Sequence, residues 1–373
     1  MKNVIGLVNF HSSPEVPPIT DSRPLGSTSF LGRYALCDFT LSNFCNSGID
    51  TVGLLVKDHQ RSILKHLGSM DAWVRNTKTS KEIIMYNEPG HEHPELNTDL
   101  QNVKENDWAL YDSNANYIVI APAHIVAPVD FRPILAEHIA RHEKITVVAT
   151  KVKDASQEFL SENILHLTKD GYIADTYRNT GEEAGPAVIS MATYIINRTV
   201  LADMIHRFLP ANPTLDIRTL IYQAAEEGGY QCHCYMYEGY ARCFDTFPHY
   251  MKYCFELLDP KVAKALFLPK WPIYTKSHDT PPAVYGENAT VVDSIIANGA
   301  IIEGTVEHSI IGRGVKIAKG AHIKNSIIFS SSRIGEGASV ENSLVDKYSM
   351  ITRSKKIGGT EEAPLYLHQG AIL

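Results

Sequence analysis

The sequence predicts a chain of two parts, an α/β domain with a mostly parallel sheet followed by a parallel β-helix. Two observations support this prediction. Over residues 1–255, short β-branched runs alternate with stretches of helical periodicity, which is typical of parallel strands connected by helices. From about residue 283, aliphatic residues recur every five or six positions and whole phrases repeat 17 residues apart. A period this short indicates the stacked coils of a solenoid.

The first part is organised around the segment 4–48. It begins with a buried strand, VIGLV at 4–8, and ends with a helix built on LCDFTLSNFCNSG. In a nucleotide-binding α/β domain the loop after the first strand cradles phosphate, using glycines and a basic side chain. Here that loop reads FHSSPE at 10–15, with no glycine, lysine or arginine. The frame of a nucleotide-binding domain is therefore present without its phosphate cradle.

The rest of the first part supplies further strands and helices. Strands are predicted at 51–56, 82–86, 117–121, 145–150, 187–196 and 230–237. Helical periodicity is found at 59–70, 132–143, 199–209, 214–227 and 247–258. Ligands of such sheets bind beyond the carboxyl ends of the strands, so a site is expected at the loops after Val8 and Ala121.

Residues 256–282 are rich in proline and are predicted to be an irregular linker, followed by the β-helix over 283–373. The repeat also predicts that Ser309, Ser326 and Ser343 stack in successive coils. An ordinary antiparallel β domain predicts neither the period nor this stack. The last residues, 354–373, are less regular and are expected to form a cap or an oligomer contact, because the end of a solenoid is an exposed edge.

Composition bounds the classes of function. The chain has 373 residues, 44% of them hydrophobic and 21% charged, which is typical of a soluble protein with about two domains. A net charge of -7 argues against sequence-independent nucleic-acid binding. No apolar run reaches the length of a membrane span, and the N-terminus has no signal-peptide pattern. A cytoplasmic location is expected, with no membrane and no nucleic-acid partner.

Cysteine and histidine spacing predicts no metal site. None of the six cysteines forms a CxxC pair, and most lie in apolar runs, as expected of buried thiols in a reducing compartment. In Cys232-His233-Cys234, strand alternation puts the two thiols on one face and the imidazole on the other. The segment His91-Glu92-His93 lies in a polar loop and is expected to be solvated.

Several phrases resemble one enzyme family. They are DFTLSN at 38–43, CNSGI at 45–49 and SMATY at 190–194, with weaker matches at 18–23 and 30–34. Together they resemble the glucose-1-phosphate adenylyltransferases, also called ADP-glucose pyrophosphorylases, over essentially the whole chain. The resemblance implies a Rossmann-like nucleotidyltransferase domain and a left-handed parallel β-helix.

The same resemblance implies a degenerate active site. The position of the family's catalytic arginine holds Glu15, and the positions of its two metal-binding aspartates hold Ala123 and Cys243. Loss of one positioned cation can cost roughly 10^3 to 10^5 in rate. Mg²⁺ prefers hard oxygen ligands, which neither a methyl group nor a thiol supplies. The Mg²⁺ site is therefore predicted to be lost, with no catalytic residues and no cofactor.

A scaffold of this kind without its catalytic groups is similar to the GlgD-type non-catalytic subunits of the family. The resemblance implies a catalytically silent, regulatory subunit of glucose-1-phosphate adenylyltransferase, which makes ADP-glucose and diphosphate from ATP and glucose 1-phosphate in glycogen biosynthesis. The implied partner is the catalytic subunit, in a heterotetramer of two plus two, with a homodimer possible when the chain is alone.

Two alternatives remain open at this point. A weakly active or altered-specificity sugar-phosphate nucleotidyltransferase would have to recruit Asp38, Asp130 or Asp245 as metal ligands. A pure scaffold would leave turnover unchanged. Basic residues near the former substrate entrance could bind an anion or effector, or could equally be solvated surface; they are Arg23, Arg33, His59 and, by a loose match to a sugar-phosphate lysine, Arg178.

Overall fold

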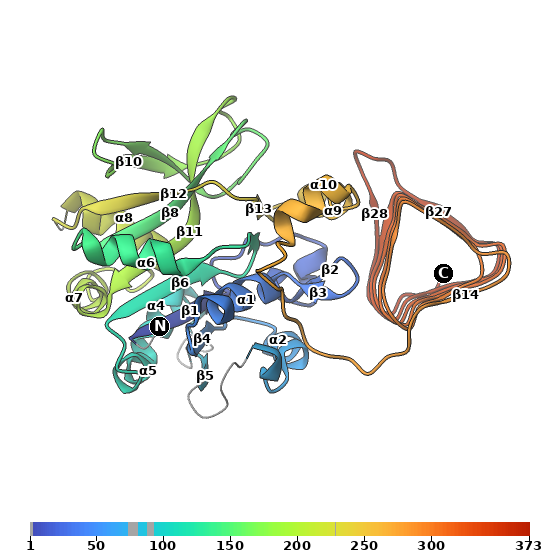
Figure 1. Ribbon diagram of the computed structural model, residues 1–373, viewed down its shortest axis with the longest axis horizontal. Helices are drawn as coiled ribbons and strands as arrows, with labels where there is room; N and C mark the ends of the chain where they lie inside the picture. The colour runs from blue at the N-terminus through green and yellow to red at the C-terminus, as the bar shows by residue number, and fades with distance from the viewer. Residues whose placement is uncertain (1–2, 74–80, 88–92, 228) are drawn as a thin grey trace.

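The computed structural model describes residues 3–73, 81–87, 93–227 and 229–373. Figure 1 shows an α/β domain on the left and a three-sided β-helix on the right, seen end-on. Within the described residues, no helix combines the length and the apolar character that a membrane crossing needs.

A nine-stranded sheet forms the centre of the α/β domain. The first strand, β1 (Val4–Asn9), lies parallel to β4 (Thr51–Leu55) on one side and to β6 (Tyr117–Pro122) on the other. The carboxyl ends of these strands therefore meet at one edge, where the loop after β1 lies. The remaining strands are β5 (Lys81–Met85), β8 (Ile145–Val152), β9 (Asn163–Leu167), β10 (Ile173–Arg178), β11 (Ala187–Asn197) and β12 (Cys232–Tyr237).

Antiparallel strands extend this parallel core. Strand β11 pairs antiparallel with β6 and β8, and the hairpin of β9 and β10 adds to it at the edge. Strand β12 pairs parallel with β8. The two strands of the hairpin were not among the predicted elements.

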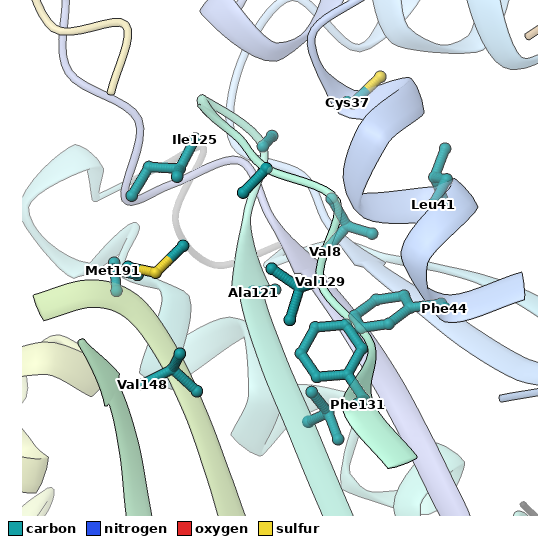
Figure 2. Packing of buried hydrophobic residues seen from close by; sticks show 14 of the residues in the cluster. Val8, Cys37, Leu41, Phe44, Ala121, Ile125, Val129, Phe131, Val148 and Met191 are labelled. Atoms are coloured by element: carbon teal, nitrogen blue, oxygen red, sulfur yellow. The ribbon is translucent and has the colours of Figure 1, made fainter. Parts of the chain in front are cut away.

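Helix α1 (Cys37–Ser47) lies across the parallel strands and is almost entirely buried. It ends at Gly48, whose φ of 78° is a left-handed conformation that glycine adopts without strain. Figure 2 shows Phe44 of α1 facing Phe131 beside Val8 and Ala121. The other helices are α2 (Gln60–Leu67), α4 (Asp99–Glu105), α5 (Asp107–Asp112), α6 (Phe131–Ala140), α7 (Arg198–Phe208), α8 (Ile217–Glu227), α9 (Phe247–Glu256) and α10 (Pro260–Leu266).

The segment 256–282 is not irregular throughout. Helix α10 occupies its first part, because the Asp259 side chain accepts a hydrogen bond from the Lys261 N–H and Pro260 suits the first helical position. Beyond α10 the chain runs without regular structure along α1. Trp271 Nε1 donates to Asn43 Oδ1 at 2.9 Å, so the linker is attached to the first helix.

The second part is a three-sided parallel β-helix, as predicted. Each face is a five-stranded parallel sheet, and its interior is lined by aliphatic residues. The faces are formed by β14 (Val284–Tyr285), β17 (Ile301–Ile302), β20 (Lys316–Ile317), β23 (Arg333–Ile334) and β26 (Met350–Ile351); by β15 (Thr290–Val292), β18 (Thr305–Glu307), β21 (His322–Lys324), β24 (Ser339–Glu341) and β27 (Lys356–Gly358); and by β16 (Ile295–Ile296), β19 (Ile310–Ile311), β22 (Ile327–Ile328), β25 (Ser343–Val345) and β28 (Leu365–Leu367).

The predicted serine stack is confirmed. Ser326 N–H donates to Ser309 Oγ at 3.1 Å, and Ser343 N–H donates to Ser326 Oγ at 3.2 Å. All three serines are fully buried. The hydroxyls of Ser309 and Ser326 therefore each accept a backbone N–H of the next coil.

The two parts pack against each other through an apolar cluster and through a buried ion pair between Arg23 and Asp346. Phe30 and Tyr250 of the α/β domain belong to one cluster with Phe329 and Leu344 of the β-helix. Short strand pairs frame this region, namely β2 (Ser29–Phe30) with β3 (Tyr34–Ala35) and β7 (Ile125–Val126) with β13 (Arg242–Cys243).

Candidate functional site

The loop after β1 is hydrogen-bonded to Asn9, the last residue of that strand. Asn9 is buried, and its side-chain oxygen accepts the backbone N–H groups of His11 and Ser12 at 2.9 and 3.2 Å. Its side-chain nitrogen donates to Asp99 Oδ2 at 2.7 Å. In a phosphate cradle such N–H groups point at the ligand. Here two of them are already occupied by an amide.

The loop also lacks positive charge. Burial, followed by the nearby Lys57 ammonium, lowers the pKa of His11 to about 4, so its ring is neutral at physiological pH. Glu15, which the resemblance placed at the position of a catalytic arginine, is exposed. The loop therefore presents a carboxylate and a neutral imidazole where polyphosphate chemistry needs cations.

Ala123 follows β6 and is completely buried. A Cβ atom added at Gly26 would lie 2.5 Å from Cβ of Ala123 and 2.8 Å from the ring of Phe10. These three residues are thus packed closely, and apolar contacts surround the Ala123 methyl group.

Cys243 lies on β13, opposite Ile125, and belongs to a buried polar cluster. The His124 ring Nε2 lies 3.2 Å from Glu162 Oε1, and one donor atom each of His124, Glu162 and Cys243 lie within 4.8 Å of one another. Arg218 contacts the other Glu162 oxygen at 3.0 Å. A thiol, an imidazole and one carboxylate paired with arginine do not fit Mg²⁺, which prefers several carboxylate or water oxygens.

The three aspartates that an active enzyme would have to recruit already have partners. Asp38 accepts the Ala35 N–H and contacts His66. Asp130 caps α6 and pairs with Arg132 at 2.7 Å. Asp245 pairs with His249 at 2.5 Å.

A cavity of about 280 Å³ remains at the carboxyl edge of the sheet. Arg178 lines it, together with Arg218 and Lys57, and with the carboxylates of Glu162 and Asp216. Positive and negative groups are mixed here, so the cavity has no strong preference for an anion.

A second cavity, of about 370 Å³, lies between the α/β domain and the β-helix. Its lining includes cations from both parts and from the linker, and none of the described residues in that lining is acidic. The basic groups are Arg33, Lys65, His66, Lys276, His278, Arg313 and Lys347. We call this cavity the basic cavity.

Burial and neighbouring positive charges lower the pKa values of two groups in the basic cavity. Burial, with the Arg23 guanidinium as the next cause, lowers the pKa of Lys347 to about 8. Burial and the neighbouring Arg33 also lower the pKa of Arg313. The Arg313 Nε is buried without a hydrogen-bond partner. An anion in this cavity would relieve both the repulsion and the missing hydrogen bond.

The structure separates the four basic residues expected to bind an anion. Arg33 lines the basic cavity and Arg178 the sheet-edge cavity. His59 is exposed at the start of α2 and lines neither. Arg23 is only 2% exposed and forms an ion pair with Asp346, so the expectation of a surface role for it was wrong. A charge inserted between two domains is stable only when paired, which explains this position.

Sequence reasoning missed most of the basic cavity. Lys65, Lys276, Arg313 and Lys347 come from three regions of the chain and have no shared spacing. Lys276 Nζ donates to the Lys65 carbonyl at 2.9 Å, and Lys65 Nζ donates to Tyr348 Oη at 3.2 Å. Only the tertiary arrangement brings them together.

The prediction of buried thiols is confirmed: all six cysteines are buried, and none forms a disulfide. Cys232 and Cys234 lie in one apolar cluster, whereas the His233 ring packs against Tyr172. His91 and Glu92 lie outside the described residues.

Comparison with known proteins agrees with this architecture. Residues 15–159 match the nucleotidyl transferase family, and residues 281–365 match the GlmU-like C-terminal hexapeptide family. The chain is 33% identical to the glycogen biosynthesis protein GlgD of Bacillus subtilis, over 95% of this chain and 92% of that protein. It is 32% identical to GlgD of Geobacillus stearothermophilus, over 82% and 78% of the two chains.

The glucose-1-phosphate adenylyltransferase of Geobacillus stearothermophilus is also similar, at 28% identity over 79% of this chain and 76% of that enzyme. The chain thus has the nucleotidyltransferase domain and hexapeptide β-helix that the resemblance implied, and its similarity to the first GlgD protein extends over nearly the full length of both chains. It belongs to the family of the glycogen biosynthesis protein GlgD.

Proposed function

We propose that this chain is a catalytically silent, regulatory subunit of a glucose-1-phosphate adenylyltransferase and acts in glycogen biosynthesis in the cytoplasm. It assembles with the catalytic subunit as a heterotetramer of two plus two and can form a homodimer when alone. Kinship with GlgD proteins and with the adenylyltransferases themselves supports a place in this system.

The main support for a lack of catalysis is the loop after β1, whose N–H groups are already hydrogen-bonded within the protein. The His11 and Ser12 N–H groups are bonded to Asn9, so a triphosphate would have to break both bonds to use them. The buried methyl of Ala123, just after β6, and the buried thiol of Cys243, on β13, agree with this. The chain accordingly needs no Mg²⁺ for its role.

The basic cavity supports the regulatory part. An anion bound there would contact the α/β domain through Arg33, the linker through Lys276 and the β-helix through Arg313. Since such a ligand touches both parts of the chain, its binding energy can favour one arrangement of them. Phosphate groups suit the site, because guanidinium groups bind phosphate through paired N–H donors.

The assay is ADP-glucose formation from ATP and glucose 1-phosphate with Mg²⁺. The chain alone should give no turnover above background, and adding it to a catalytic subunit should change the activity or the apparent substrate affinity. Co-elution in gel filtration with light scattering measures the assembly. Turnover by the chain alone would favour an active nucleotidyltransferase, whereas no co-elution and no effect would favour a pure scaffold.

A paired variant tests the basic cavity. Arg313→Ala should abolish any thermal stabilisation by inorganic phosphate or diphosphate, and with it any effect of these anions on the mixed complex. Arg353→Ala is the matched control, because Arg353 is an exposed arginine of the same β-helix and pairs with Glu336 at 3.5 Å. Equal responses of the two variants would contradict an anion site in the cavity.

A further inference from the structure

The buried cluster of His124, Glu162 and Cys243 has unsatisfied polar atoms. His124 and Cys243 are fully buried, and Glu162 is 2% exposed. The His124 Nδ1 atom and the Glu162 Oε2 atom have no hydrogen-bond partner, although Arg218 lies 3.0 Å from that oxygen. A buried imidazole nitrogen without a partner is costly, so each such group calls for an explanation.

The donor set matches one class of ion. Thiolate, imidazole and carboxylate are the three protein ligands of Zn²⁺, which binds them at about 2.0 to 2.3 Å. Two ligands of a tetrahedral ion at those lengths lie roughly 3.3 to 3.7 Å apart. The three donor atoms lie within 4.8 Å of one another, so side-chain movements of about 1 Å would complete the geometry.

The charges around the cluster also favour a divalent cation. The carboxylates of Glu162 and Asp245 lie beside Cys243, where they would attract a cation. Arg218 contacts Glu162, and His249 contacts Asp245. Asp245 Oδ2 is itself buried and without a hydrogen-bond partner.

A route to the cluster exists. Glu162 lines the sheet-edge cavity, together with Ser161 and Arg218, whereas His124 and Cys243 are buried behind it. An ion can therefore enter past Glu162, and a water molecule can take the fourth position from the cavity side. Arg218 also donates to the Ser161 carbonyl at 2.8 Å, so it keeps a partner if the ion displaces it from Glu162.

A second cluster of possible ligands, Cys37, Asp38 and His66, differs in an informative way. Both Asp38 oxygens already have partners, since one accepts the Ala35 N–H and the other contacts His66. Among the described residues, no side-chain nitrogen or oxygen atom of that cluster is left buried without a hydrogen-bond partner. The polar groups of this second cluster therefore do not require an ion to satisfy them.

We propose that His124, Glu162 and Cys243 form a binding site for Zn²⁺, a soft-ligand metal site in place of a magnesium site. The ion binds the Cys243 thiolate, a His124 ring nitrogen and a Glu162 oxygen, and the thiol proton is released to solvent. This inference does not depend on the regulatory function, because it concerns metal content and not turnover.

The test uses the full-length chain after chelator treatment, titrated with Zn²⁺, Co²⁺ and Mg²⁺. One Zn²⁺ per chain should bind, Mg²⁺ in large excess should not displace it, and Co²⁺ should give thiolate-to-metal charge-transfer absorption. Cys243→Ser should weaken Zn²⁺ binding at least about 100-fold and abolish that absorption. Cys234→Ser, another buried thiol in a strand, should leave both unchanged.

Absence of stoichiometric Zn²⁺ binding by the wild-type chain would overturn the proposal without any variant. Unchanged binding in Cys243→Ser would do the same, as would loss of binding in Cys37→Ser, which would place the ion at the other cluster. If Cys243→Ser does not fold, Glu162→Gln serves instead, with the same loss of Zn²⁺ affinity expected and retention counting against the site.

Discussion

The buried ion pair between Arg23 and Asp346 offers the sharpest test of how the two parts are joined. Arg23 Nη1 lies 2.9 Å from one carboxylate oxygen and Nη2 lies 2.5 Å from the other, a bidentate arrangement. The Arg23 side chain is 2% exposed and that of Asp346 is 1% exposed. Tyr366 Oη also donates to Asp346 at 2.6 Å. The pair therefore joins residues 323 positions apart in a buried site.

Arg23→Met keeps much of the side-chain volume against Phe329 and removes the charge. It leaves the Asp346 carboxylate buried without its cation, which should cost about 3 to 5 kcal/mol. That corresponds to a fall in Tm on the order of 10 °C in a chain of this size. Thermal and urea unfolding measure the loss, and limited proteolysis in the linker after α10 should show the parts separating first.

A double variant and an exposed pair complete the design. Arg23→Met/Asp346→Leu removes both charges and should recover part of the loss, because a buried pair replaced by apolar groups is often near neutral. Arg353→Met breaks an exposed pair and should change stability by no more than about 1 kcal/mol. If Arg23→Met were as mild as Arg353→Met, or the double variant no better than the single one, the reasoning would be refuted.

Three further predictions concern Ala123 after β6, the serine stack of the β-helix and the basic cavity. Ala123→Asp should lower Tm and give no ADP-glucose synthesis, since the new carboxylate would be forced into the contacts with Phe10 and Gly26; recovered turnover would contradict this. Ser326→Ala should cost about 1 to 3 kcal/mol in urea unfolding, because the buried Ser343 N–H loses its acceptor. Phosphate affinity, measured by calorimetry, should fall as pH rises through about 8, where Lys347 loses its charge in the anion-free protein, and Lys347→Met should flatten that dependence.

Much of the fold could be predicted because it depends on local repetition. The 17-residue phrases of the β-helix relate inward residues of successive coils, such as Ile311 and Ile328, and the stacked serines follow from the same period. The missed elements carried weaker local signals. Thr98 caps α4 by accepting the Gln101 N–H at 3.2 Å, and Gly171, with φ of 83°, forms the turn of the β9–β10 hairpin.

The sites were less predictable because they depend on contacts across the chain. Arg23 is a surface cation by sequence, and only its neighbour Asp346 in the last coils explains why it is buried. The basic cavity combines Lys65 of α2, Lys276 of the linker and Arg313 of the β-helix, which no local pattern connects. The assignment of Glu15, Ala123 and Cys243 to the family's catalytic positions came from the resemblance and stays a prediction.

The opening segment separates into parts with different physical roles, and this explains how a phosphate site can be lost while the fold remains. The DFTLSN stretch makes structural bonds: Thr40 Oγ1 donates to the Pro122 carbonyl at 2.8 Å, and Asn43 Nδ2 donates to the Ala127 carbonyl at 2.7 Å. These bonds attach α1 to the segment after β6 and do not involve a ligand. The loop at 10–15 instead makes bonds with Asn9, so its residues can differ from those of a phosphate cradle without breaking the contacts of α1. A protein that keeps α1 thus keeps the surfaces on which its linker and β-helix are built, whether or not it binds a nucleotide.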